Sequence, residues 1–323
     1  NLYISSPRKK GVFPYMLRNF LIFLSDNKPI RKMVTCFQIS KDMASRFVAG
    51  ETLEEAIPRV KELNNMGMTA TMDHLGEHVK DRAEAEASAN SYLHLLDTIK
   101  KENLRAHVSV KLTMMGLAID RNFCMENVER IIKQAREYEI FVRIDMEGSD
   151  CTQPTLDVFY ALREKYENVG IVIQSYLHRT EDDIKELIKK KAFVRLCKGA
   201  YKEPLSIAFQ NKKDVEGNYL KLMEMVMAPE VLATGYYPAI ATHDVKMIIG
   251  TKRYVKEKKI RPDQFEFQML YGVRRDLQKI LVREGYNMRI YVPYGTEWYP
   301  YYLRRLAEKT DNITFILRNL MLD

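Results

Sequence analysis

The sequence predicts an α/β fold, a (βα)8 TIM-like barrel with an N-terminal helical arm and a short C-terminal helix. From about Ala70 onward, short β-branched runs alternate with longer stretches of helical period, and eight such runs are present. No Gly-x-Gly sequence occurs anywhere in the chain. Because open doubly wound sheets more often have five or six strands and a glycine-rich first turn, a closed barrel is favoured.

The chain has 323 residues, enough for a barrel of about 250 residues with extensions at both ends. Amphipathic stretches at 127–138 and 182–190 separate predicted strands, and in the first of them Val128, Ile131 and Ala135 recur at helical spacing. The eight predicted strands cover residues 68–73, 107–112, 141–146, 170–174, 193–197, 239–243, 265–270 and 288–292.

The residues before the first strand are predicted to form helices that pack on the barrel. One helix is expected at 15–25 and a second at 52–65, where Thr52 followed by two glutamates is typical of a helix start. A short apolar helix at 314–322 follows an Asp-Asn pair that resembles a cap. We therefore divide the chain into an arm at 1–67, a catalytic barrel at 68–309 and a C-terminal helix at 310–323.

Composition and charge exclude several classes of protein. With 46% apolar and 29% charged residues, the chain is ordinary for a globular protein and unlike a disordered one. The formal charge of +8 comes from 51 basic and 43 acidic residues spread along the chain, without a concentrated basic block. Since no recognised nucleic-acid-binding motif is present either, we predict no nucleic-acid partner.

The cysteines and the apolar runs bear on location. The four cysteines are widely spaced and form no CxxC pair, which is typical of reduced thiols in a reducing compartment. The most apolar early run, residues 20–24, is far shorter than the roughly 20 residues that a membrane span requires. We therefore expect a cytoplasmic protein without a transmembrane helix.

Polar residues close five of the predicted strands. In barrels of this kind, catalytic groups come from the C-terminal ends of the strands and from the loops that follow them, an end that we call the mouth. Any one polar residue there is better explained as a helix cap or a salt bridge, but the whole set would converge on one site that needs a ligand. The residues are Lys111, Asp145, Gln174, Arg195, Lys198, Thr242 and His243.

The predicted mouth is cationic. Three of these strand-end residues are lysine or arginine, and Arg304 and Arg305 join them from the helix after the eighth strand. Such a site favours a cofactor phosphate or a substrate carboxylate, and the planar guanidinium group matches a carboxylate with two parallel hydrogen bonds. Glu308 follows these arginines at a spacing of three and four residues, from which it can hold either guanidinium in place.

The motifs in this part of the chain resemble those of a known family. Residues 107 to 306 contain, in order, VSVKLT, RIDMEGS, IVIQSYLHR, VRLCKGAY, IATHD, FEFQMLYG, RIYVPYG and YLRRL. This series is similar to that of the proline dehydrogenase family. The resemblance implies FAD held in a distorted eight-stranded barrel and oxidation of L-proline to 1-pyrroline-5-carboxylate, by hydride transfer from C5 to FAD N5, as the first step of proline catabolism.

The resemblance also implies partners and residue roles. A membrane quinone would reoxidise the flavin and a pyrroline-5-carboxylate dehydrogenase would take the product, with peripheral contact at the inner face of the membrane left open. By the same resemblance, Asp145 and Arg195 are catalytic. The substrate-binding residues are Lys111, Arg304 and Arg305 as a carboxylate clamp, Tyr291, Tyr301 and Leu270 as walls around the proline ring, and Glu308. The FAD-binding residues are Met146, Gln174, Arg195, Lys198, Gly199, Ala200, Tyr201, Thr242 and His243.

Physical reasons support several of these roles. Asp145 is expected to orient Lys111 and nearby tyrosines, Arg195 to stabilise negative charge that grows on the flavin, and Gly199 to let the backbone approach a flat ring. Proline arrives as an ammonium ion, and burial beside cations favours the neutral amine that hydride loss requires. We expect no indispensable protein base, since solvent can take the proton. Cys197 departs from the family's more frequent aliphatic residue and is expected to pack.

Three other interpretations remain. The H-x-x-E-H pattern at residues 74–78 is that of a zinc hydrolase, but it starts at a strand end and contains a glycine, whereas a zinc site of this kind needs a helix. We therefore predict no metal site. A Schiff-base lysine at Lys111 or Lys198, as in an aldolase-like barrel, explains one lysine but not the paired arginines. A non-catalytic binder of anionic surfaces would use the amphipathic segment 15–24.

Overall fold

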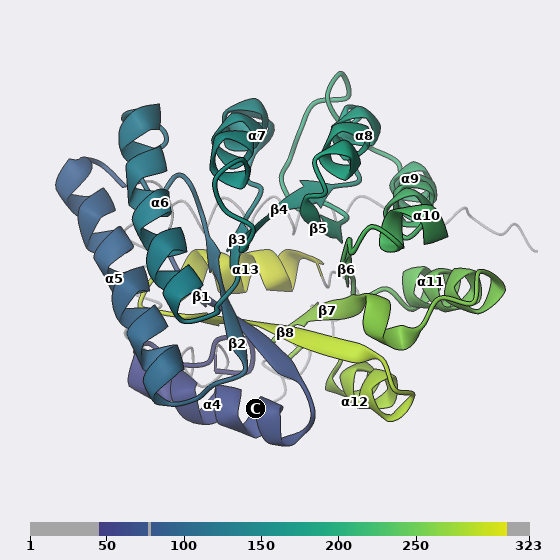
Figure 1. The fold of residues 1–323 in the computed structure, drawn as a ribbon, viewed down its shortest axis with the longest axis horizontal. Helices are drawn as coiled ribbons and strands as arrows, with labels where there is room; N and C mark the ends of the chain where they lie inside the picture. Colours follow the sequence, from purple (N-terminus) through teal and green to yellow (C-terminus); the bar gives the residue numbers. More distant parts are fainter. Residues whose placement is uncertain (1–44, 77–78, 309–323) are drawn as a thin grey trace, which may run out of the picture.

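The computed structural model describes residues 45–76 and 79–308 (Figure 1). Its eight strands are parallel, each pairs with the strands before and after it in sequence, and β1 pairs with β8 to close the barrel. The predicted fold class is therefore confirmed. The helices expected at 15–25 and 314–322 lie outside the described residues.

The strands lie within two residues of their predicted bounds. They are β1 (Thr69–His74), β2 (Ala106–Val110), β3 (Val142–Ile144), β4 (Val169–Gln174), β5 (Phe193–Cys197), β6 (Ala239–Ala241), β7 (Glu266–Leu270) and β8 (Asn287–Tyr294). The last strand is longer than predicted because β1 pairs with it from Thr69, opposite Arg289, to His74, opposite Tyr294.

Helices alternate with these strands and surround them (Figure 1). They are α4 (Leu53–Asn65), α5 (Arg82–Lys101), α6 (Arg121–Glu137), α7 (Ser149–Arg163), α8 (Thr180–Lys189), α9 (Lys212–Val226), α10 (Pro229–Leu232), α11 (Val245–Glu257), α12 (Arg275–Arg283) and α13 (Trp298–Glu308), with a 3-10 turn at Pro262–Gln264. None of the described helices is both long enough and apolar enough to cross a membrane.

Capping side chains decide where two helices begin. The predicted start of α4 is confirmed, since Thr52 Oγ1 accepts a hydrogen bond from the backbone N–H of Glu55 at 3.3 Å. The amphipathic stretch at 127–138 lies largely within α6, which begins six residues earlier, at Arg121. Asp120 accepts a hydrogen bond from the N–H of Phe123 at 3.0 Å, so the helix begins directly after it.

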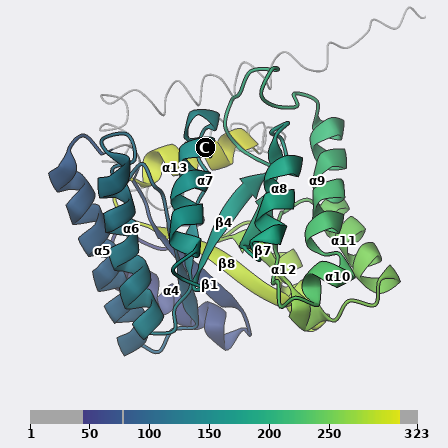
Figure 2. The same cartoon turned by 45° about the horizontal axis from the view of Figure 1, so that its top comes forward.

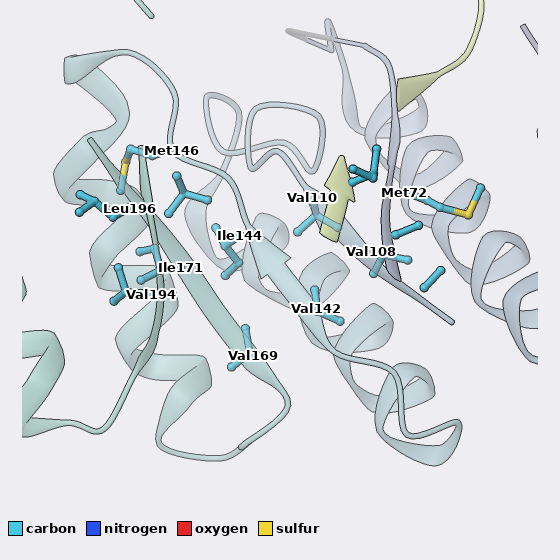
Figure 3. Close-up of a cluster of buried hydrophobic side chains, with 14 of the residues drawn as sticks. Met72, Val108, Val110, Val142, Ile144, Met146, Val169, Ile171, Val194 and Leu196 are labelled. Atoms are coloured by element: carbon cyan, nitrogen blue, oxygen red, sulfur yellow. The ribbon is translucent and has the colours of Figure 1, made fainter. Parts of the chain in front are cut away.

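The apolar core lies between the strands and the surrounding helices. Alternate strand residues such as Val108, Val110, Val142, Ile144 and Ile171 are fully buried, and Figure 3 shows them in one cluster. Each fully buried side chain of this size contributes about 1.5–3 kcal/mol through removal of apolar surface from water. The strand register is therefore set by these residues, because a shift of one position would exchange them for their polar neighbours.

The remaining strand residues point into the barrel, and many are polar. Arg195 on β5 and Tyr291 on β8 both donate hydrogen bonds to Asp145, which follows β3, at 2.9 and 2.7 Å. Strands that are not neighbours can be joined in this way only through the interior. Nearer the strand starts, Arg289 on β8 forms a buried ion pair with Glu266 on β7 at 2.8 Å.

Helix α13 follows β8 and does not continue the outer ring of helices. In Figure 1 it crosses the centre of the ring, and in Figure 2 it lies at the end of the barrel toward which the strands point. Its aromatic residues Trp298, Tyr299 and Tyr302 are buried against Phe47 and Val48 from the segment before α4. The chain thus covers part of the mouth with its last described helix.

Candidate active site

Lys111 and Asp73 form the most deeply buried ion pair at the mouth among the described residues. Lys111 follows β2, and its ammonium group lies 2.7 Å from each carboxylate oxygen of Asp73 on β1. Asp73 also accepts a hydrogen bond from the hydroxyl group of Tyr92 on α5 at 3.3 Å. Asp145 lies farther away, with one oxygen 3.7 Å from Lys111 Nζ. The predicted pairing of Asp145 with Lys111 is thus present, and Asp73, which the prediction did not include, makes the closer contacts.

Asp145 is also the centre of a second network. Its carboxylate accepts hydrogen bonds from Ser109 Oγ at 2.6 Å, Arg195 Nη1 at 2.9 Å and the Tyr291 hydroxyl group at 2.7 Å. The Arg195 guanidinium also lies 5.3 Å from the centre of the Tyr291 ring, within the range of a cation–π contact. The predicted contact between Asp145 and a tyrosine is thus present in the structure.

The pKa values of Asp73 and Asp145 are shifted in opposite directions. Burial raises the pKa of Asp145, but Arg195 and Lys111 outweigh it, so the net shift is downward. For Asp73, burial is the largest effect and the net pKa is raised in spite of Lys111. Burial lowers the pKa of Lys111, yet Asp73 and Asp145 together raise it above its ordinary value. The lysine therefore stays charged at neutral pH.

Arg195 and Gln174, at the mouth, hold buried polar atoms that have no hydrogen-bond partner among the described residues. They are Nε and Nη2 of Arg195 and Oε1 of Gln174. The Gln174 amide nitrogen makes long hydrogen bonds, of 3.4 Å, to the backbone carbonyl groups of Met146 and Glu147. Since a buried polar group without a partner is costly, these atoms mark the place where a ligand would supply hydrogen bonds.

Lys198 and Thr242 lie on the side of the mouth formed by β5 and β6. Lys198 Nζ is 2.7 Å from Asp244 and 3.5 Å from Glu216, so its charge is paired by two carboxylates. Thr242 Oγ1 accepts a hydrogen bond from the N–H of Asp244 at 3.1 Å and thereby fixes that carboxylate at the start of α11.

His243 and Leu270 are joined directly. The backbone N–H of Leu270 donates a hydrogen bond to His243 Nε2 at 2.8 Å, which requires that nitrogen to be unprotonated. The other ring nitrogen, Nδ1, therefore carries the proton whenever the ring is neutral. The contact ties the loop after β6 to the end of β7, where Leu270 was predicted to line the substrate site.

The structure gives another reason for glycine at position 199. Gly199 has a φ of +105°, and a Cβ atom there would overlap the Tyr176 ring, so the ring occupies the space that a side chain would need. Ala200 is exposed and Tyr201 is half-buried. The Met146 side chain packs in the apolar cluster of Figure 3, and its backbone carbonyl accepts a hydrogen bond from Gln174 Nε2.

The predicted clamp residues come from α13. Arg304 and Arg305 are both half-buried, and the Arg305 guanidinium lies 5.2 Å from the centre of the buried Tyr301 ring, one helical turn earlier. The Glu308 side chain lies outside the described residues. Thus α13 carries arginine and tyrosine side chains on a helix that crosses the mouth.

Sequence analysis missed Asp73, Ser109 and Asp244. Asp73 stands in the first predicted strand, so the rule that was applied to the second to sixth strands would have found it. Ser109 is the residue before the last in β2 and carries no such signal, because only the barrel geometry brings it to Asp145. Asp244 is recognisable as a helix cap, but its ion pair with Lys198 depends on the tertiary structure.

A cavity among the described residues lies away from the mouth. A cavity of about 380 Å³ opens at the opposite end of the barrel, where Thr69, His107 and Arg289 line it. Active sites of such barrels lie at the other end.

No cluster of three or more His, Cys, Asp and Glu side chains within 45–76 and 79–308 is placed to hold a metal ion. His74 belongs to strand β1, whereas Glu77 and His78 lie outside the described residues.

Comparison with known proteins identifies relatives over most of the chain. A family model described as proline dehydrogenase matches residues 56–318. Proline dehydrogenase 2 of Bacillus subtilis is 44% identical over 303 residues, which cover 94% of this chain and 98% of that protein. Proline dehydrogenase of Deinococcus radiodurans is 39% identical over 285 residues, with coverage of 87% and 90%.

A solved structure agrees with these matches. Proline utilization A from Bdellovibrio bacteriovorus, inactivated by N-propargylglycine, superposes with a TM-score of 0.79 and 26% sequence identity. The match covers 91% of this chain but 37% of that larger protein. On the family match and the identity to relatives of similar length, this chain belongs to the proline dehydrogenase family.

Proposed function

We propose that this chain oxidises L-proline to 1-pyrroline-5-carboxylate, the first step of proline catabolism, with bound FAD taking the C5 hydride at its N5 atom. Family membership supports the reaction. The observation that carries the proposal is the buried mouth network, in which Lys111 pairs with Asp73 and Arg195 pairs with Asp145. It fixes two cations and two carboxyl groups at the end of the barrel that α13 crosses.

The described residues fit FAD. Arg195 presents Nε and Nη2 and Gln174 presents Oε1, all buried and without a partner among the described residues, so a bound ring with donors and acceptors would satisfy them. Lys198, Thr242 and His243 contribute polar groups on the adjacent side. In this proposal Arg195 stabilises negative charge that develops beside it, because its guanidinium is already oriented by Asp145.

The proline carboxylate binds to Lys111, Arg304 and Arg305. The raised pKa of Lys111 keeps an ammonium group available at neutral pH, and arginine forms paired hydrogen bonds to a carboxylate. Tyr291, Tyr301 and Leu270 would surround the ring of the substrate. An ordered clamp of this kind lowers the barrier by several kcal/mol because the reacting atom is oriented before reaction.

The proline nitrogen has to lose a proton before or during the reaction. The cations at the mouth favour the neutral amine by raising the free energy of the ammonium form. Asp145 is a weak base because its pKa is lowered and it accepts three hydrogen bonds. Solvent therefore takes the proton in this proposal, and Asp145 orients Arg195 and Tyr291.

The partners follow from the proposed reaction. A membrane quinone accepts the electrons, peripheral contact with the inner face of the membrane brings the chain to it, and a pyrroline-5-carboxylate dehydrogenase receives the product. The cytoplasmic location and the division into arm, barrel and C-terminal helix likewise stay predictions.

Two alternatives are less well supported. A Schiff-base lysine needs a lowered pKa, whereas the pKa of Lys111 is raised and Lys198 is paired with Asp244 at 2.7 Å. The segment 15–24 that would bind an anionic surface lies outside the described residues.

Anaerobic addition of L-proline to the purified, flavin-loaded chain tests the proposal. We expect the absorbance at about 450 nm to decrease, as it does when a flavin is reduced. D-proline and pipecolate are the controls for handedness and ring size. A yellow protein whose absorbance is unchanged by L-proline would contradict the proposed reaction.

A further inference from the structure

The segment 46–51, which we call the strap, is fixed to the rim of the barrel beside β8. The N–H of Ala49 donates a hydrogen bond to the carbonyl oxygen of Pro293, and the N–H of Gly295 donates one to the carbonyl oxygen of Gly50, both at 2.9 Å. These two backbone hydrogen bonds hold the strap against the C-terminal end of β8. Its position is therefore set by the barrel itself.

A close backbone contact fixes the other end of the strap. The carbonyl oxygen of Arg46 lies so near Gly272, in the loop after β7, that a Cβ atom on Gly272 would overlap it. Gly272 also has a φ of +74°, which favours glycine. The strap is thus seated on both β7 and β8 ends and cannot move independently of the mouth.

The strap in turn holds the first turn of α13. Trp298, the first residue of that helix, is 2% exposed and donates a hydrogen bond from Nε1 to Glu51 Oε1 at 3.0 Å. One turn later, the centre of the Tyr302 ring lies 6.1 Å from the centre of the Phe47 ring. Both contacts are made by residues of α13 that share one face, since they stand four positions apart.

We infer that Glu51 is a positioning residue for the substrate clamp, an inference that rests on the proposed function. The hydrogen bond from Trp298 sets the start of α13, and Arg305 stands seven residues further on, about 10 Å along the same helix axis. Because a helix moves as a rigid unit, a shift in the position of Trp298 displaces the guanidinium groups of Arg304 and Arg305. Glu51 itself takes no part in the chemistry.

The test uses the FAD-loaded enzyme and compares Glu51→Ala with Glu51→Gln, which keeps an acceptor oxygen without the charge. For Glu51→Ala we expect the KM for L-proline to rise about three- to tenfold, the change that follows from one lost hydrogen bond, with kcat within about twofold. Glu51→Gln should recover the KM of the unmodified enzyme. Glu62→Ala, at an exposed position of α4, controls for loss of an acidic side chain.

A second readout is independent of activity. Trp298 is the only tryptophan in the chain, so its fluorescence and its quenching by acrylamide report directly on how well the start of α13 is packed against the strap. Quenching should increase in Glu51→Ala and not in Glu51→Gln or Glu62→Ala. Trp298→Phe, which removes the donor but keeps an aromatic ring, should raise the KM as well, and the double variant should add nothing further.

The outcomes separate this inference from the proposed function. If quenching of Trp298 increases while the KM is unchanged, or if Glu51→Gln fails to recover the KM, or if the two substitutions act additively, the inference is overturned and proline oxidation stands. If the unmodified enzyme oxidises no L-proline, the proposed function falls and the inference falls with it.

Discussion

At the scale of single residues, the buried pair of Lys111 and Asp73 decides whether the mouth can keep a cation. Removing one partner of a buried ion pair leaves the other charge uncompensated, so Asp73→Asn should reduce the free energy of unfolding by about 3–5 kcal/mol. Urea denaturation measures this loss. Asp73→Asn combined with Lys111→Met should regain most of it, and a single variant as stable as the parent would show that Asp145 alone can hold the lysine.

The arginines of α13 are expected to affect binding more than chemistry. Arg304→Met or Arg305→Met should raise the KM for L-proline by well over tenfold, because each loses charge-assisted hydrogen bonds to the carboxylate, while FAD stays bound. Steady-state kinetics with the absorbance spectrum of the purified variant measures both effects. Arg283→Met, at an exposed position of α12, is the matched control. Unchanged saturation by proline in both variants would count against the clamp.

Arg195 should behave differently, because its guanidinium faces the predicted cofactor site. Arg195→Met is expected to slow flavin reduction in a single-turnover measurement more than it weakens proline binding, since the charge that it stabilises develops only during the reaction. Arg195→Lys, which keeps the charge but not the forked geometry, should recover part of the rate. An intact reduction rate in Arg195→Met would remove this residue from the mechanism.

At the scale of elements, the caps explain where the helices begin. Asp120→Ala should lower the free energy of unfolding by about 1 kcal/mol, because the N–H of Phe123 at the start of α6 loses its acceptor. Thermal or urea denaturation measures the change. Asp120→Asn keeps an acceptor oxygen and should cost much less, whereas equal losses in both variants would assign the effect to the ion pair between Asp120 and Arg82.

At the scale of the whole molecule, His107 couples stability to pH. Burial, followed by the charges of Arg289, Arg143 and Arg195, lowers the pKa of His107 well below its ordinary value, so the folded chain keeps the ring neutral. Below about pH 6.5 the unfolded chain binds a proton that the folded chain does not, and stability falls by up to about 1.4 kcal/mol per pH unit.

Urea denaturation between pH 7 and pH 5 checks this dependence. His107→Asn should make the fall in stability less steep, and a remainder is expected because burial lowers the pKa of His74 as well. A slope that His107→Asn leaves unchanged would assign the acid sensitivity to other groups.

The sequence was sufficient for the barrel, since the strand period and the number of runs are local signals. It was also sufficient to predict that Lys111, Asp145 and Arg195 lie at one mouth, because the ends of parallel strands meet there. It was not sufficient for the partners within that mouth. The pairing of Asp73 with Lys111 and of Ser109 with Asp145 joins consecutive strands, 38 and 36 residues apart in sequence, and Tyr176 fills the space beside Gly199. These partners depend on the barrel geometry, and no local pattern indicates them.

The pairing of β1 with β8 also has a consequence for synthesis on the ribosome. The first strand begins at Thr69 and its closing neighbour ends at Tyr294, so most of the polypeptide has to emerge before the cylinder can form. Until then Asp145 lacks its hydrogen-bond partner Tyr291 on β8. A nascent chain that has not yet exposed β8 and α13 therefore lacks part of the predicted site, which is complete only after α13 has left the ribosome.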